Sequence, residues 1–484
     1  MVLPANWLLM PHRGRWRVFI VVSSFVFYAG WDWRYTGLLA ASILANQAFA
    51  VWVARATDEQ ARNRRTGFAV ATNLAVLGWY KYAGFFAESA GGLFRAVGLG
   101  WELPIPNVVL PVGISFFTFQ ALSYVIDVRR ERLRPVPLAD FAVYLAFFPH
   151  LVAGPIVRAA ELLPQLRHPR DPRRVPAGMA FWLIGAGLFK KVVVASYLAD
   201  RIVDPLFAFP GQHGGIEALV GVYAYAIQIY ADFSGYTDMA IGLALLLGFR
   251  FPQNFDAPYT ASSLQDFWRR WHMTLSRWLR DYLYIPLGGS RGPRWRTYRN
   301  LLLTMLLGGL WHGAAWTFVV WGAIHGAGLG VERWLDERRE ARRTLLAALP
   351  VADHEPLPTG YGTVIVEPSP PVDDRGPLWV RRFVTFHVVC LAWVFFRANS
   401  IDAALDLLGR IAGATGTAAL NPMVPLVVLA MLASQFVPAD TVGRFRSRFA
   451  SWGLPAQAAA LAAVIVAVDA LGPPGVSPFI YFQF

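Results

Sequence analysis

Charge and cysteine are both scarce in this sequence of 484 residues. Only 15% of the residues are charged while 56% are hydrophobic, and the mean hydropathy is +0.40. This composition excludes a soluble globular protein, because apolar runs near the ~20-residue length that spans a bilayer recur along the chain. The single cysteine, Cys390, lies in one of those runs. One cysteine excludes an intramolecular disulfide and a cysteine-based metal site.

The motifs of soluble enzymes are also missing. The sequence contains no HExxH zinc motif, no GxSxG nucleophile elbow, no P-loop and no GxGxxG dinucleotide fingerprint. We therefore expect no metal and no bound cofactor. Acidic residues are few, since 31 of them against 44 basic residues give a net charge of +13. The basic residues fall in short loops between apolar runs, so they indicate membrane orientation and not nucleic-acid binding.

Apolar segments of spanning length are what the chain has in abundance. They predict an all-α, polytopic membrane protein with roughly 10 to 13 membrane segments, some of them re-entrant or interfacial. We expect residues 1–484 to form one integral membrane domain with a cytoplasmic N-terminus and an uncleaved first helix. The candidate segments are 17–31, 34–54, 66–86, 107–127, 138–154, 177–199, 215–232, 236–250, 298–313, 315–331, 379–396, 420–437 and 455–471.

Basic loops predict which side of the membrane each connection occupies. The positive-inside rule assigns five of them to the cytoplasm: 55–65, 129–134, 158–174, 269–299 and 333–343.

Three segments depart from plain spanning helices. Segment 138–154 has basic loops on both sides, which predicts a re-entrant segment. Lys190 and Lys191 lie inside an apolar run, so we expect them either to snorkel or to mark a helix end at the interface. Residues 346–378 are polar and rich in proline, which predicts a mobile cytoplasmic loop.

The apolar run at 301–326 contains the most informative polar side chain. His312 lies between Gly309 and Gly313 and directly follows Trp311. An ionisable residue at membrane depth costs free energy, so it is a functional-site hypothesis by default. Imidazole suits proton transfer near neutral pH, and the glycines predict close approach of another backbone or of a ligand. The alternative is a structural histidine that is bonded between helices.

Residues 262–284 predict one amphipathic helix at the cytoplasmic interface. His272 belongs to its apolar arc, so the side chain should face protein or bilayer, and a core histidine with a hydrogen-bond partner is the alternative. Four arginines on the opposite side predict contact either with anionic headgroups or with an anionic substrate such as the phosphates of coenzyme A. They are Arg269, Arg270, Arg277 and Arg280.

Two acids lie between apolar runs in the sequence YADFSGYTDMAIG at 230–242. Asp232 and Asp238 predict a helix break with local side-chain capping. A structural role is favoured over a catalytic one, although Asp232 stays a candidate substrate-binding residue and an ion path is an alternative. His325 follows His312 by 13 residues, ~220° around a continuous helix, so the two should not share a face.

Several stretches resemble one family of membrane enzymes. They are LPVGISFFTFQALSYVIDVRR at 110–130, FFPHLVAGPIVR at 147–158, YADFSGYTDMAIGLALLLGFRFPQNFDAPY at 230–259, FWRRWHMTLSRWLRDYLYIPLGG at 267–289, GGLWHGAAWTFVVWGAIHG at 308–326 and AWVFFRA at 392–398. In this order they resemble the membrane-bound O-acyltransferases, in particular the membrane subunit of bacterial alginate O-acetylation. The resemblance covers most of residues 110–400.

The resemblance implies a fold, an activity and a location. It implies tilted helices around a central tunnel, in the bacterial inner membrane, and acyl transfer from a cytosolic thioester donor to a hydroxyl. Acetyl-CoA is the implied donor, a polysaccharide such as alginate the implied acceptor, and a periplasmic acetyltransferase the implied partner protein. Membrane lipid surrounds the chain.

The resemblance also assigns roles to the two histidines. His312 is the presumed catalytic residue of the family, and His272 is the second motif position, which implies that it orients a group. A base can take the proton of the acceptor hydroxyl, which suits His312. The oxyanion then needs a donor, which His272, Trp311 or a backbone N–H could supply. A transient acyl-histidine is an alternative.

Two other functions stay open at this stage. One is D-alanyl transfer to a cell-wall polymer, and the other is transport of a glycan or lipid, for which Asp232, Asp238, Lys190 and Lys191 supply intramembrane charges. A non-catalytic scaffold is less attractive, because scaffolding does not require the two histidines.

Overall fold

The computed structural model describes residues 1–99, 101, 104, 108–347, 375–413 and 420–472. All regular elements within these residues are helices, so the all-α prediction is confirmed. Four helical stretches among them are long and apolar enough to cross a membrane, namely Arg13–Ala54, Ala177–Ala208, Leu378–Arg397 and Leu454–Leu471. The predicted loop at 346–378 lies almost wholly outside the described residues.

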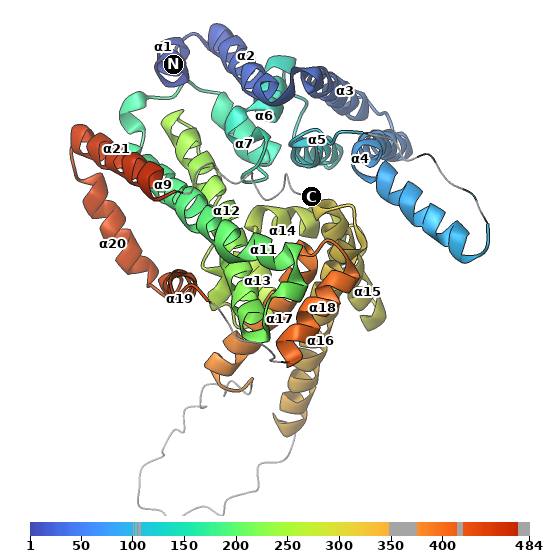
Figure 1. Cartoon of the computed structure of the whole chain (residues 1–484). Coiled ribbons are helices and arrows are strands. Elements are labelled where there is room, and N and C mark those ends of the chain that lie inside the picture. The colour runs from blue at the N-terminus through green and yellow to red at the C-terminus, as the bar shows by residue number, and fades with distance from the viewer. Residues whose placement is uncertain (100, 102–103, 105–107, 348–374, 414–419, 473–484) are drawn as a thin grey trace, which may run out of the picture.

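The helices divide into an N-terminal group and a larger second group (Figure 1). The first group comprises α1 Val2–Leu9, α2 Arg13–Asp32, α3 Thr36–Ala54, α4 Glu59–Ala96, α5 Ile114–Arg129, α6 Leu138–Ala146, α7 Phe148–Leu151 and α8 Ala159–Leu162. The second comprises α9 Ala177–Leu188, α10 Ser196–Leu198, α11 Asp204–Ala208, α12 Gly215–Leu246, α13 Leu264–Arg270, α14 Met273–Leu279, α15 Arg294–His312, α16 Trp316–Ala347, α17 Leu378–Arg397, α18 Ile401–Gly413, α19 Met423–Ser434, α20 Ala439–Ala450 and α21 Leu454–Leu471.

Each group has its own apolar core, and a small aromatic cluster joins them. Tyr124 of α5 belongs to the first core and Trp321 of α16 to the second. The joining cluster contains Phe119 of α5, Trp278 of α14 and Trp311 of α15. The Phe119 ring stacks on that of Trp278 with 3.7 Å between centroids and lies 5.2 Å from that of Trp311. The motifs that carry the candidate histidines therefore make one contact between the two groups, and the end of α12 makes another, where Leu247 joins the first core.

Ion pairs bring the basic segments onto one face of the molecule. Arg62 joins 55–65 to 129–134 through Glu131, and Arg158 joins 158–174 to 269–299 through Asp281. Burial would raise the pKa of the Asp281 carboxyl, but hydrogen bonds from Arg280 and Arg158 outweigh burial and lower it.

Two further bonds complete this set. Arg130 donates to the carbonyl of Asp281 at 3.0 Å, and Arg294 pairs with Glu337 of the 333–343 segment at 3.6 Å. All five predicted cytoplasmic segments are thus connected, and we call this side of the molecule the basic face.

The predicted break between 215–232 and 236–250 is wrong, because α12 runs unbroken through both acids. Lys190 bonds Asp238 at 2.6 Å, and Lys191 bonds Asp232. Both lysines lie in the π-helical turn Phe189–Ala195 that continues α9, so they neither snorkel nor end a helix. Paired acids need no local capping, which removes the reason for a break.

The segment 138–154, which is predicted to be re-entrant, contains a helix break. Helix α6 ends at Ala146 and α7 begins at Phe148. The backbone N–H of Phe148 donates to the hydroxyl of Ser24 on α2 at 3.2 Å. A buried side chain therefore satisfies a backbone group that the break releases, which an irregular segment at membrane depth requires.

Candidate functional site

The predicted helix 262–284 is interrupted at His272. Helix α13 ends at Arg270, α14 begins at Met273, and His272 between them has φ of 42°. The backbone N–H of Met273 donates to the carbonyl of Asn254 at 2.9 Å, and that of Thr274 donates to the Asn254 side-chain oxygen at 3.1 Å. A residue 18 positions upstream thus sets the break, and the imidazole of His272 is fully buried.

His312 is the last residue of α15, and close backbone contacts with α16 begin near this end of the helix. A Cβ added at Gly309 would collide with the carbonyl oxygen of Phe318, and one at Gly322 with that of Met305. The predicted close approach of another backbone is therefore confirmed at Gly309, whereas Gly313 lies against the side chain of Phe318. Gly309→Ala should strongly lower the amount of folded protein, which detergent size-exclusion fluorescence would measure against Gly330→Ala, whose added Cβ meets only ordinary contacts.

Side chains of α4 hold the C-terminal end of α15. The Lys81 ammonium donates to the carbonyls of Trp311 at 2.5 Å and His312 at 3.0 Å, and the Tyr82 hydroxyl donates to that of Leu310 at 2.7 Å. The last carbonyls of a helix have no partners within the helix and carry partial negative charge. A cation and a hydroxyl from another helix therefore fix the turn that presents His312.

Trp311 connects the two candidate histidines. Its ring centroid lies 5.0 Å from that of His312 and 6.2 Å from that of His272. On its other sides His312 meets the ring of Trp321 at 5.0 Å and that of Phe396 at 5.2 Å. The structure thus brings His272, Trp311 and His312 together in an aromatic environment in which all three side chains are buried.

A cavity of about 330 Å³ reaches His312. Its polar lining includes Lys81 and His312, and its remaining walls are Trp31, residues 109–116, Val152 and Trp311. Helix α4 begins at Glu59, which is bonded to Arg129 at the basic face. Lys81 lies 22 residues further on, about 33 Å along the helix axis. The cavity, which we call the His312 cavity, is therefore on the side of the molecule away from the basic face.

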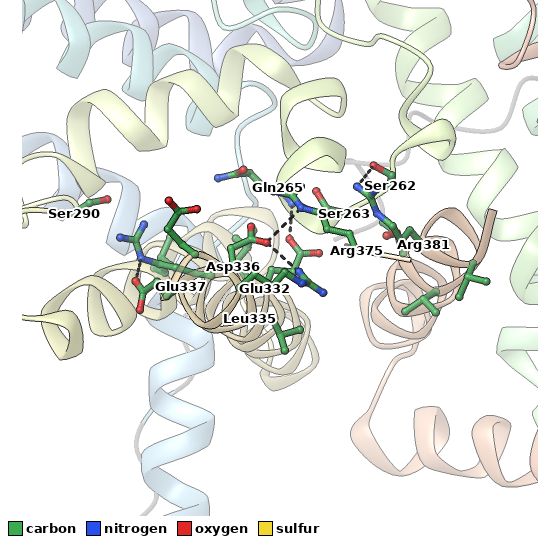
Figure 2. Close-up of a pocket in the computed structure, with 18 of the residues that line it drawn as sticks. Ser262, Ser263, Gln265, Ser290, Glu332, Leu335, Asp336, Glu337, Arg375 and Arg381 are labelled. Carbon is green, nitrogen blue, oxygen red and sulfur yellow. Dashed lines mark hydrogen bonds and ion pairs between the residues drawn. The ribbon is translucent and has the colours of Figure 1, made fainter. Parts of the chain in front are cut away.

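A second cavity of about 730 Å³ lies at the basic face (Figure 2). Glu332 of α16 projects there toward the start of α13 and accepts hydrogen bonds from the backbone N–H groups of Leu264 at 2.5 Å and Gln265 at 3.1 Å. Its charged lining has both signs: Glu332, Arg333, Asp336, Glu337, Arg339, Glu340, Arg343, Arg375 and Arg381. We call it the basic-face cavity.

Helix α16 links the regions of the two cavities. Trp321 touches both His312 and His325, with ring centroids 5.0 and 4.8 Å away. The two histidines lie on different helices, α15 and α16, so an angle around one continuous helix does not describe their positions. His325 Nδ1 accepts a hydrogen bond from Trp268 Nε1 at 3.3 Å, and both side chains are buried.

The four predicted arginines do not line the His312 cavity. Arg270 pairs with Asp266, Arg277 with Glu161 and Arg280 with Asp281, while Arg269 donates to Gln265. Asp232 is also elsewhere, because it is paired with Lys191. Among the described residues no cluster of His, Cys, Asp and Glu could hold a metal ion.

The Asp232–Lys191 pair provides a test of a structural role. Asp232→Asn should destabilise the protein by about 3–5 kcal/mol, because it leaves an ammonium in a buried site without its counter-charge. The double variant Lys191→Met/Asp232→Leu removes both charges and should lose much less. Thermal unfolding in detergent would compare them, and equal losses in both variants would contradict the structural role.

Sequence reasoning missed two residues of the site. Lys81 lies inside the predicted span 66–86, where a charge at membrane depth is a signal for function. Nothing in the sequence marked Asn254 as a functional residue, because asparagine is common in polar segments between helices. Its role depends on contacts with residues 272–274 that only the fold creates.

Comparison with known proteins agrees with the motifs. The sequence model of the membrane-bound O-acyltransferase family, MBOAT, matches residues 25–340. The chain is 41% identical over 401 residues to the probable alginate O-acetylase AlgI of Azotobacter vinelandii, covering 82% of this chain and 72% of the relative.

Two further relatives act on other polymers by name. The peptidoglycan O-acetyltransferase of Helicobacter pylori is 34% identical over 430 residues, which is 83% of this chain and 74% of the relative. The teichoic acid D-alanyltransferase of Streptococcus thermophilus is 29% identical over 299 residues, which is 59% of this chain and 68% of the relative.

Proposed function

Since the chain belongs to the membrane-bound O-acyltransferase family, we propose that it transfers acetyl groups from acetyl-CoA toward hydroxyls of an extracellular polysaccharide. It is a membrane O-acyltransferase, and the finer proposal concerns donor, acceptor and location. The single observation that carries it is His312, which lines a cavity on the side away from the basic face. An acceptor that enters this cavity can reach the imidazole.

The chemistry we propose assigns one proton transfer to His312. As the hydroxyl oxygen attacks the thioester carbonyl, the imidazole takes the hydroxyl proton. When the C–S bond breaks, this same proton passes from the imidazolium to the departing thiolate, which leaves His312 neutral. The oxyanion needs hydrogen-bond donors, and the Lys81 ammonium lines the same cavity as His312. The rings of Trp311 and Trp321 both contact the His312 ring. They limit the access of water to it, which reduces hydrolysis of the thioester.

Donor and location follow from the basic face. We propose that this face is cytoplasmic, that the membrane is the bacterial inner membrane, and that residues 1–484 form one membrane domain. Acetyl-CoA would approach from this side, and arginines in the wall of the basic-face cavity suit its phosphates. The acetyl group would pass at the opposite face either to the polymer or to a periplasmic acetyltransferase.

Two alternatives are less well supported. D-alanyl transfer rests on relatives of lower identity and coverage than the O-acetyltransferases. The transport hypothesis was based on four intramembrane charges. In the structure these charges form two ion pairs, so they offer less support for an ion path.

The test is mass spectrometry of the surface polysaccharide from cells with and without the intact gene. Acetyl esters that depend on the gene would support the proposal and identify the polymer. Purified protein in vesicles, supplied with labelled acetyl-CoA, would then show the donor. D-alanyl esters in place of acetyl esters would contradict it.

A further inference from the structure

Asn254 organises the turn that contains His272. Its backbone carbonyl accepts the N–H of Met273, and its side-chain Oδ1 accepts both the N–H of Thr274 at 3.1 Å and the Thr274 hydroxyl at 2.8 Å. The same Oδ1 lies 3.1 Å from His272 Nδ1. Asn254, His272 and Thr274 are all buried, so this network has no competition from bulk water.

The orientation of the Asn254 amide follows from its partners. A backbone N–H can only donate, so the atom that faces the N–H of Thr274 must be the carbonyl oxygen and not the amide nitrogen. The amide nitrogen in turn lies 3.4 Å from the hydroxyl of Thr237 on α12, which can accept. The N–H of Thr274 alone therefore assigns the amide, and the Thr237 hydroxyl, which can donate or accept, is compatible with that orientation.

This orientation determines which nitrogen of His272 carries the proton. An amide oxygen only accepts, so Nδ1 must be the N–H and, in the neutral ring, Nε2 must carry the lone pair. Nε2 is buried and has no hydrogen-bond partner among the described residues. A buried acceptor without a partner costs free energy unless something else satisfies it.

Resting on the function proposed above, we propose that Asn254 is a positioning residue that holds neutral His272 as its Nδ1–H tautomer. His272 then presents a hydrogen-bond acceptor at Nε2 to a donor hydrogen of the bound substrates. This excludes neutral His272 as the donor to the oxyanion, which was one of its two expected roles. Stabilisation of the oxyanion falls to other groups of the site, such as the Lys81 ammonium.

The surroundings of His272 make this arrangement specific. Its ring meets Phe233 of α12 at 4.6 Å, Phe255 at 6.5 Å and Trp311 of α15 at 6.2 Å between centroids. Across this aromatic shell, a charge on the His272 ring acts on that of His312. Asn254 is thus the neighbour that can select the tautomer of His272.

The direct test is nitrogen NMR of the full chain in lipid bilayers, with ¹⁵N-labelled histidine and His272 assigned from its loss in His272→Gln. We expect a protonated Nδ1 and an unprotonated Nε2 at neutral pH. A protonated Nε2 would overturn the proposal. This measurement does not need enzymatic activity. If the wild type transferred no acetyl groups, the proposed function would be refuted, while the NMR result would still determine the tautomer of His272.

Asn254→Asp tests the positioning role through activity. The carboxylate can accept the same bonds but adds a negative charge, so the imidazolium form of His272 should persist to a pH about one to three units higher. The acid limb of kcat/KM should move to higher pH by the same amount. Thr237→Val, which leaves Oδ1 in place, is the matched control and should keep the wild-type tautomer and profile. An unchanged profile in Asn254→Asp would contradict the positioning role.

Discussion

His312→Ala is expected to abolish polymer acetylation in cells and to lower acetyl transfer in vesicles by about 10²–10⁴-fold, the contribution of a positioned general base. The loss follows from chemistry, because a hydroxyl is a weak nucleophile until its proton is accepted. His312 lines the cavity on the side away from the basic face and ends a helix whose last carbonyls are held by α4. Mass spectrometry of the polymer and a labelled-donor assay measure the two effects.

The control for this prediction must separate chemistry from packing. His312→Gln keeps more of the side-chain volume and should be equally inactive while it accumulates in membranes. His325→Gln changes another buried histidine that touches the same Trp321 but does not line the cavity, so it should retain most activity. Full activity in His312→Gln, or equal loss in His325→Gln, would remove His312 as the base.

The two histidines could be identified from sequence because each breaks a local pattern. His312 interrupts an apolar run, and His272 falls on the apolar arc of a periodic segment. Both predictions depend only on residues nearby in the sequence. In the structure both histidine rings lie beside Trp311. The basic loops could likewise be assigned to one face, because the excess of Lys and Arg that marks a cytoplasmic loop is read within each loop.

The wrong predictions share a physical cause, which is a partner distant in sequence. Helix α12 stays continuous because Lys191, 41 positions away, neutralises Asp232. The helix at 262–284 breaks because Asn254 accepts hydrogen bonds from the backbone N–H groups of Met273 and Thr274. These bonds replace bonds within the helix, and the hydrophobic periodicity of the segment contains no information about them. Tertiary contacts override local propensity in both cases.

The arginine face shows a different limit of sequence reasoning. Its four residues are predicted to meet an anionic substrate or headgroups, and within the protein three of them also form ion pairs with acids. Charge on a helix face predicts exposure to water or to an acid, and it does not distinguish a ligand from a neighbouring side chain.

Lys81→Met is expected to lower acetyl transfer by about 10–100-fold, because hydrogen bonds from a charged group contribute about 1.5–3 kcal/mol. The ammonium holds the carbonyls of Trp311 and His312 and also lines the cavity. Without it the last turn of α15 loses its cap, and a small displacement of a catalytic group is costly. Initial rates with labelled acetyl-CoA, at equal amounts of folded protein, measure the effect.

The matched control for Lys81 is its neighbour. Tyr82→Phe removes a bond to the same helix end, at Leu310, but Tyr82 does not line the cavity. It should cost about 1 kcal/mol of stability and leave the rate nearly unchanged. Lys81→Arg keeps a cation and should retain more activity than Lys81→Met. If Tyr82→Phe and Lys81→Met lose activity equally, the lysine acts only as a cap; if neither loses activity, the end of α15 does not need α4 to present His312.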